Sequence, residues 1–189
     1  MRWRQVIVLY AVLAALGAAY WSLAPRSRRA GDEGPPARAR FLPVDAGGFA
    51  AIRVVRGGRT IRARRVAEDR WEVTEPADAA IPSDLVAAFA GALADAEEIQ
   101  RVAGAGADPE AFGLGEAAAH VEIELADGKT LGLAIGETNA NGTAVYARRD
   151  PGSDVVLIGR NARYYEDLLF QALPGGRVPA GAGELPVGG

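Results

Sequence analysis

The sequence predicts an α+β domain of antiparallel β-meanders or hairpins with two packing helices, preceded by one N-terminal transmembrane helix. Three observations carry this prediction. Residues 112–136 contain an alternating pair of strands, residues 82–101 and 161–173 repeat apolar side chains at helical spacing, and residues 6–23 form an uncharged apolar run. Strands followed by a helix occur twice along the chain, a two-fold similarity of a kind that arises easily by chance.

The hairpin within residues 112–136 is the strongest fold signal. Its first strand alternates polar residues with three apolar ones, Val121, Ile123 and Leu125. Such alternation is typical of a strand with one buried and one solvated face. Asp127-Gly128 predicts the turn, because glycine accepts the positive φ of a tight two-residue loop. The return strand carries apolar residues at alternate positions, Leu131, Leu133 and Ile135.

Three shorter strands are expected to open the domain. Their apolar positions are Ile52 and Val54, then Ile61 and Ala63, then Trp71 and Val73. A turn at residues 56–59, Arg-Gly-Gly-Arg, separates the first two strands. Trp71 has polar neighbours on both sides, so we expect its ring to anchor the core. Two later strands are predicted around residues 145–146 and 155–158.

Two helices follow from apolar residues repeated at helical spacing. The first is predicted from about Pro82 or Ser83 to Arg101, with an apolar stripe of Leu85, Val86, Phe89, Leu93 and Ala96. The second is predicted over residues 161–173, with a stripe of Tyr165, Leu168, Leu169 and Leu173. Between them, Asp108 and Pro109 indicate a single helical turn, because aspartate caps a helix and proline suits its first position.

The chain divides into four parts. Residues 1–24 form the predicted membrane anchor, because the 18 apolar residues from Val6 to Leu23 would span ~27 Å as a helix. A cleaved signal peptide or a buried soluble helix are the alternatives. Residues 25–47 are predicted to be a flexible linker, residues 48–173 the α+β domain, and residues 174–189 a disordered tail. Arginines flank the apolar run on both sides, so the positive-inside rule assigns no orientation.

Composition excludes several function classes. The sequence has no cysteine, which excludes disulfides, thiol catalysis and cysteine-zinc sites, and it has one histidine and one lysine. The overall charge is −3, yet residues 1–29 hold five arginines and no acid, so the remainder of the chain is acidic. An acidic domain is a poor nucleic-acid binder. We expect no nucleic acid, no cofactor, no metal and no identified small-molecule substrate.

Two candidate metal or catalytic sites are weak. Residues 137–142, Glu-Thr-Asn-Ala-Asn-Gly, resemble the start of a calcium loop, but the twelfth position is Arg148, where a bidentate glutamate is needed. We interpret this segment as a hairpin turn. His120 has no second histidine or cysteine beside it and begins a strand on its solvated face. Acid pairs of the kind used by glycosidases cannot be recognised from sequence spacing.

A cluster of arginines between residues 53 and 65 is the main charged feature of the predicted domain. On paired strands, Arg53, Arg62 and Arg64 are expected to share the solvent face. This patch is a hypothetical contact for anionic lipid headgroups or an acidic partner. The alternative is a charged face that keeps the strands soluble and their edges unpaired.

The order of short motifs resembles the bacterial family called domain of unknown function 4340. The motifs are the apolar anchor, Gly57-Gly58, residues 70–76, the helix after them, Phe112-Gly113-Leu114, the central hairpin, and residues 144–146 and 155–158. The likeness covers residues 48–173 in a single copy, with Gly115 standing where an acid is common in the family. The resemblance implies an envelope protein on the extracytoplasmic face, sometimes associated with gliding-motility-type ABC transport systems. It implies no catalytic residues.

Two functional hypotheses follow. The first is a non-enzymatic accessory or interaction domain of a bacterial envelope complex, possessing a single span in the inner membrane and a protein partner in the envelope. The second is an envelope hydrolase or carbohydrate-binding module with a carboxylate site. A concave site holding two convergent acids would favour the second hypothesis, and a filled core with an exposed apolar or arginine-rich face would favour the first.

Overall fold

The computed structural model describes residues 38–104 and 106–174, together with Trp3. Apart from Trp3, the predicted anchor lies outside these residues, as do the linker before Arg38 and the tail after Pro174. Within the described part of the chain, no helix is long and apolar enough to cross a membrane. The transmembrane helix therefore stays a prediction.

The domain is built on one eight-stranded sheet in the order β3-β2-β1-β5-β6-β7-β8-β4, and every neighbouring pair is antiparallel. Its strands are β1 Phe49–Arg56, β2 Arg59–Ala67, β3 Arg70–Glu75, β4 Gln100–Ala103, β5 Ala119–Leu125, β6 Thr130–Thr138, β7 Ala144–Asp150 and β8 Val155–Gly159. The sheet follows chain order except at two places: β1 lies between β2 and β5, and β4 joins the far edge beside β8. The antiparallel α+β prediction is confirmed.

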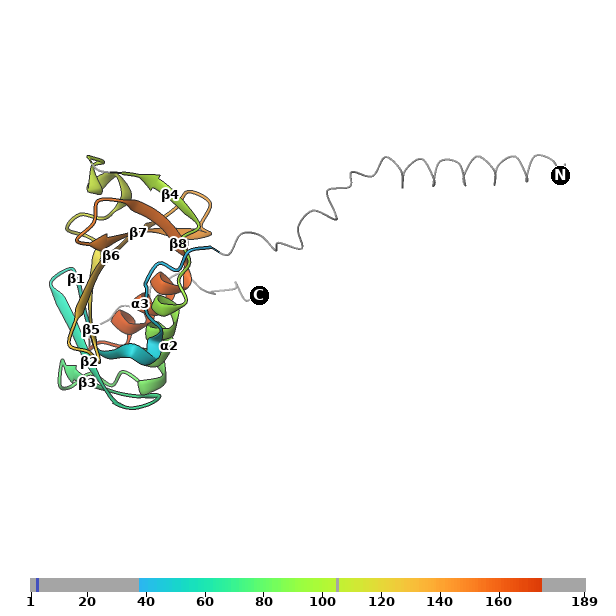
Figure 1. The fold of residues 1–189 in the computed structure, drawn as a ribbon. Helices are drawn as coiled ribbons and strands as arrows, with labels where there is room; N and C mark the ends of the chain where they lie inside the picture. The colour runs from blue at the N-terminus through green and yellow to red at the C-terminus, as the bar shows by residue number, and fades with distance from the viewer. Residues whose placement is uncertain (1–2, 4–37, 105, 175–189) are drawn as a thin grey trace, which may run out of the picture. The chain divides into compact units, whose positions relative to one another are not determined.

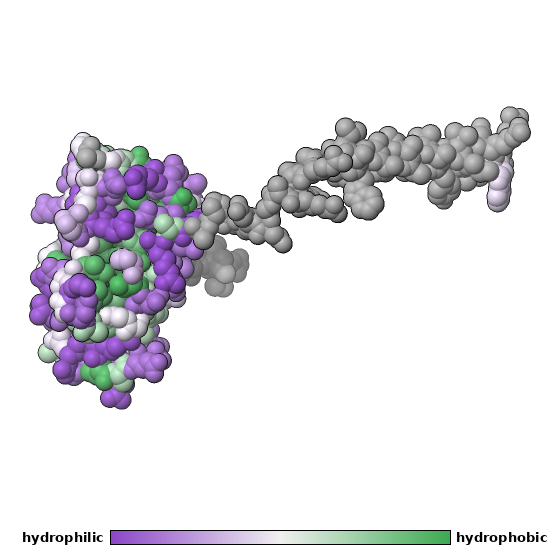
Figure 2. Space-filling view, viewed as in Figure 1, coloured by the Kyte–Doolittle hydropathy of each residue, from purple (hydrophilic) through white to green (hydrophobic). Residues whose placement is uncertain are grey.

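Both α-helices pack together on one side of the sheet (Figure 1). They are α2 Ser83–Ala94 and α3 Asn161–Gln171, and two short 3-10 helices, η2 Ala46–Gly48 and η3 Pro109–Phe112, complete the elements. The main core lies between the helices and the strands, and its largest fully buried side chains include Phe49, Phe89, Ile123, Leu169 and Phe170. Seen from the same side, hydrophilic surface covers both ends of the domain and apolar surface gathers near its middle (Figure 2).

The predicted central hairpin is present as β5 and β6. Burial along β5 alternates residue by residue, with Ala119, Val121, Ile123 and Leu125 inside. At the turn, Gly128 has φ 81° and Asp127 Oδ1 accepts the backbone N–H of Lys129 at 3.1 Å. Local sequence specified this hairpin fully, because the turn and the alternation agree on one register.

A second, smaller apolar cluster covers the other face of the sheet near β6 and β8. Leu114 and Ala118, from the segment before β5, pack on Ala134 and Val155, and the Phe112 ring meets the Tyr146 ring edge-on at 5.1 Å. Asp108 caps η3 as predicted, with its side chain accepting the N–H of Glu110. The sheet is therefore covered on both faces in its β6–β8 half.

The first helix is shorter than predicted. It ends at Ala94 instead of Arg101, and Gln100–Ala103 form the edge strand β4. The segment between is held by long-range backbone bonds: Ala96 O accepts from Phe41 N at 2.7 Å, and Ile99 N donates to Leu157 O at 2.8 Å. Pairing with distant segments thus overrides the helical propensity of residues 95–101.

The packed unit begins before residue 48. Phe41 and Leu42, which the sequence analysis placed in the linker, are 0% and 1% exposed. Residues 38–47 accordingly belong to the domain, and an isolated antiparallel β-bridge pairs the backbones of Arg40 and Glu97. The sequence predicted a linker here because Phe41 and Leu42 stand among prolines, glycines and charged residues. Two adjacent apolar residues alone show no helical or strand periodicity.

Trp71 is the predicted core anchor, and its ring is 4% exposed beneath the Arg65 guanidinium, 4.9 Å from the ring centroid. We expect Trp71→Ala to lower the free energy of unfolding by ~3–5 kcal/mol, because the small side chain leaves a cavity. Denaturant unfolding of the purified protein measures the change. Val66→Ala, at an exposed site on β2, is the control; equal midpoints for both variants would contradict the assignment.

Two glycines provide a matched test of the second cluster. A Cβ at Gly136 would overlap the carbonyl oxygen of Phe112, whereas a Cβ at Gly91 on α2 would meet nothing within 4 Å. Gly136→Ala should therefore destabilise the domain by about 1–3 kcal/mol. Gly91→Ala should stabilise it by up to ~1 kcal/mol, because alanine favours the helix. Thermal unfolding gives the melting temperature of each variant. Equal shifts of the two melting temperatures would refute this packing.

Candidate interaction surface

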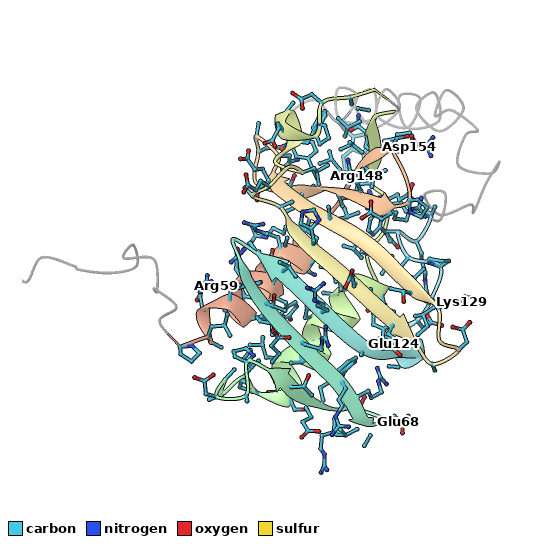
Figure 3. All side chains as sticks on the ribbon, turned by 90° about the vertical axis from the view of Figure 1, so that its left-hand side faces the viewer. Arg59, Glu68, Glu124, Lys129, Arg148 and Asp154 are labelled. Atoms are coloured by element: carbon cyan, nitrogen blue, oxygen red, sulfur yellow. The ribbon has the colours of Figure 1, made fainter. Side chains whose placement is uncertain are left out.

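The face of β3-β2-β1-β5 that points away from the helices is the candidate surface. Side chains alternate along each strand, so Ile52, Val54, Ile61 and Ala63 enter the core while their neighbours point outward. Figure 3 shows these strands in front with both helices behind them, and Glu124 lies on this side. The three predicted patch residues, Arg53, Arg62 and Arg64, share this face, because Arg53 stands opposite Arg62 and Arg64 follows two residues later.

Two of the three arginines are already paired with carboxylates. Arg53 Nη1 lies 3.0 Å from Glu122 Oε2, its cross-strand neighbour on β5. Arg64 donates from Nε and Nη2 to Glu72 Oε2 on β3, at 3.0 and 2.6 Å. Among the described residues, Arg62 has no ion pair. The cross-strand register produces these pairs, because opposite residues on one face stand side by side.

The charges on this face nearly balance. Three carboxylates, Glu72, Glu122 and Glu124, stand with the three arginines, in rows set by strand pairing. A shallow hollow of about 220 Å³ lies among them, lined by Ala51, Ile52, Arg53, Arg62, Glu122, Glu124 and Thr130. A face of mixed charge suits a protein surface of complementary charges better than a uniformly anionic bilayer.

The other sites from the sequence lie apart from this face or carry no cluster. Residues 139–142 turn β6 into β7, with Asn139 Oδ1 accepting the N–H groups of Thr143 and Ala144 at 3.0 and 3.1 Å. His120 is exposed on β5, opposite Val55 and Ala134. Within the described ranges, no three His, Cys, Asp or Glu side chains gather as metal ligands.

A buried charge cluster at the end of β1 was missed by the sequence analysis. Glu166 on α3 is 0% exposed, the one charged side chain fully buried among the described residues. Arg56 Nη1 lies 2.6 Å from Glu166 Oε1 and 2.6 Å from Asp167 Oδ1. Arg163 Nη1 lies 3.3 Å from Glu166 Oε2. A signal existed: Glu166 occurs four residues after buried Ala162 and four before Phe170, on the apolar stripe of the helix.

Burial raises the pKa of Glu166 from 4.5 to about 7. The loss of water is the largest cause; Arg163 and then Arg56 oppose it, and Asp167 adds to it by like-charge repulsion. Arg56 and Arg59 also lie over the ring of Phe170, at 4.5 and 5.3 Å from its centroid. Figure 3 shows Arg59 beside α3. The residue 56–59 turn is thereby held against this helix.

These features define the class of protein: an α+β domain whose antiparallel sheet carries two helices on one face and a charged surface on the other. A family model described as Domain of unknown function (DUF4340) matches residues 71–171. The chain belongs to this family, which confirms the resemblance seen in its motifs. The matched span runs from Trp71 to the end of α3 and excludes β1 and β2, the strands that carry the arginines. No curated protein and no solved structure matches the chain.

Two arginines of the same strand allow a test of the buried cluster. We expect Arg56→Gln to destabilise the domain by about 3 kcal/mol at about pH 8, because it removes a partner from a buried carboxylate. Arg53→Gln removes a pair in which the two side chains are 38% and 56% exposed, so its cost should stay below ~1 kcal/mol. The denaturation midpoints of the two variants measure these losses of stability. Similar losses in both would show that burial of the carboxylate partner does not set the loss of stability.

Proposed function

We propose that the protein is a membrane-tethered, non-enzymatic accessory domain that binds a protein partner in a bacterial envelope complex. One observation carries the proposal: both helices lie behind the sheet, so β3-β2-β1-β5 present an ordered charged face to the outside (Figure 3). Cross-strand ion pairs hold Arg53 and Arg64 in place before a partner arrives. Pre-ordered side chains lower the entropy lost on binding.

The chemistry of the face indicates the kind of partner. Arg62 stands between two ordered arginines without an ion pair among the described residues, so its guanidinium is the best candidate to receive a carboxylate from outside. Glu124, which lines the same hollow from β5, offers an acceptor for a basic group. A partner surface with an acid opposite Arg62 and a base opposite Glu124 would complement both. Charge of this kind contributes to orientation and association rate more than to affinity.

The location belongs to the same proposal. The apolar run of residues 6–23 supports a single span in the inner membrane, and the family resemblance supports an extracytoplasmic domain. An association with a gliding-motility-type ABC transport system is the most specific form of the hypothesis.

Photo-crosslinking in native membranes tests this proposal. A crosslinking residue at Thr130, on the rim of the hollow, should capture a discrete partner, while one at Gln171, exposed on α3, should not. Adding Arg62→Gln should reduce capture about tenfold, more strongly at low salt, because the lost contact is electrostatic. Arg101→Gln, which changes an exposed arginine on β4 at the far edge of the sheet, is the matched control. Equal capture in both variants would exclude this face as the binding surface.

The carboxylate-site hypothesis has one supporting observation. The hollow holds Glu122 and Glu124, two residues apart on β5 and both directed outward. Glu122 is engaged by Arg53, which leaves Glu124 to contact a sugar. Binding of cell-wall polysaccharide that is lost in Glu124→Gln would favour a carbohydrate-binding module over a protein-docking domain.

A further inference from the structure

We propose that the contact between the β1–β2 turn and α3 is a pH-sensitive latch, closed while Glu166 is protonated and loosened when Glu166 ionises. A fully buried carboxylate stands at the end of the hairpin whose outer face carries Arg53 and Arg62, and Arg56 and Arg163 reach its oxygens at ion-pair distance without hydrogen-bond geometry. Buried polar groups are normally satisfied, so an exception of this kind calls for a physical explanation.

Four charged groups form the latch. From the end of β1, Arg56 Nη1 approaches Glu166 Oε1 and Asp167 Oδ1, both at 2.6 Å. From α3 itself, Arg163 approaches Glu166 at 3.3 Å and Asp167 at 3.5 Å. Two arginines therefore contact two carboxylates. The two carboxylates differ in solvent access, because the Asp167 side chain is 42% exposed and that of Glu166 is 0% exposed. Water therefore reaches Asp167 but not Glu166.

The turn has what it needs to move as a unit. Gly57 and Gly58 occupy positive φ, 53° and 74°, and a Cβ at either would meet nothing within 4 Å. Beyond the turn, Arg59 lies over the Phe170 ring. Lifting this turn breaks the contacts with α3, and the β1–β2 ladder from Val55 to Ala51 can stay paired. The opening is therefore local, and it admits water to Glu166.

The direction of the pH effect follows from the two states. In the closed state Glu166 is buried and holds its proton up to a pKa of about 7, whereas a solvated glutamate releases it near 4.5. The closed state thus binds the proton more tightly. The stabilisation of the closed state is complete below about pH 4.5 and is lost as the pH rises to about 7, above which both states are ionised and pH has no further effect. The latch works in this way whether or not the open face of the sheet binds a partner.

Amide hydrogen exchange on the full-length protein tests the latch. Protection is compared at about pH 5.5 and about pH 8, after correction for the intrinsic exchange rate at each pH. In the wild type, we expect protection of residues 56–59 and of α3 to fall on the order of tenfold as the pH rises. Amides of β6 report any general effect of pH. In Glu166→Gln, which keeps the shape and removes the ionisation, the fall should be absent.

Asp167→Asn is the matched control, because it neutralises the exposed carboxylate of the same cluster and should retain the fall. Carboxyl carbon NMR of Glu166 in the wild type gives a second measurement that needs no variant. Unchanged or rising protection with pH in the wild type would overturn the proposal. A fall that persists in Glu166→Gln, a fall lost in Asp167→Asn, or a Glu166 titration near its ordinary pKa would also overturn it.

Discussion

The position of β1 between β2 and β5 is the constraint on which the rest of the domain depends. The register of β1 with β2 and its register with β5 both place Ile52 and Val54 beside apolar residues of the neighbouring strand. These side chains point into the core that the helices cover. Since side chains alternate, the same registers force Arg53 outward beside Arg62 and Glu122. A slip of one residue would exchange the two sets, placing arginine in the core and aliphatic groups in water. The hydrophobic core and the charged face are thus two results of one pairing.

The end of β1 shows how the core tolerates a charge. Arg56 follows Ile52 and Val54 in the inward row of β1 and so faces α3, where Glu166 occupies a position on the apolar stripe of that helix. A hydrophobic residue at position 166 would fill the same space without desolvating a carboxylate. The chain instead keeps an acid there and surrounds it with Arg56 and Arg163, so a marginal electrostatic balance sets the contact between the hairpin and the helix.

The accuracy of the sequence prediction varied with the range of the interactions involved. The β5–β6 hairpin, the single turn at Asp108 and the burial of Trp71 were predicted, because each is specified by neighbouring residues. Residues 95–101 were predicted to be helical, since alanines and glutamates favour helix locally, but bonds to Phe41 and Leu157 decide their structure. The predicted face of Arg53, Arg62 and Arg64 follows from alternation alone. Their carboxylate partners could not be predicted, because they depend on which strands become neighbours.

The sequence by itself determined the fold class, the positions of seven of the eight strands and the family, through turn residues and apolar periodicities that act over a few positions. Only the tertiary structure decided that β4 closes the far edge of the sheet, that Phe41 and Leu42 belong to the core, and that Glu166 meets Arg56. The physical reason is sequence separation. Arg56 and Glu166 stand more than a hundred positions apart, and a contact over that distance exists only after the sheet has brought β1 beneath α3.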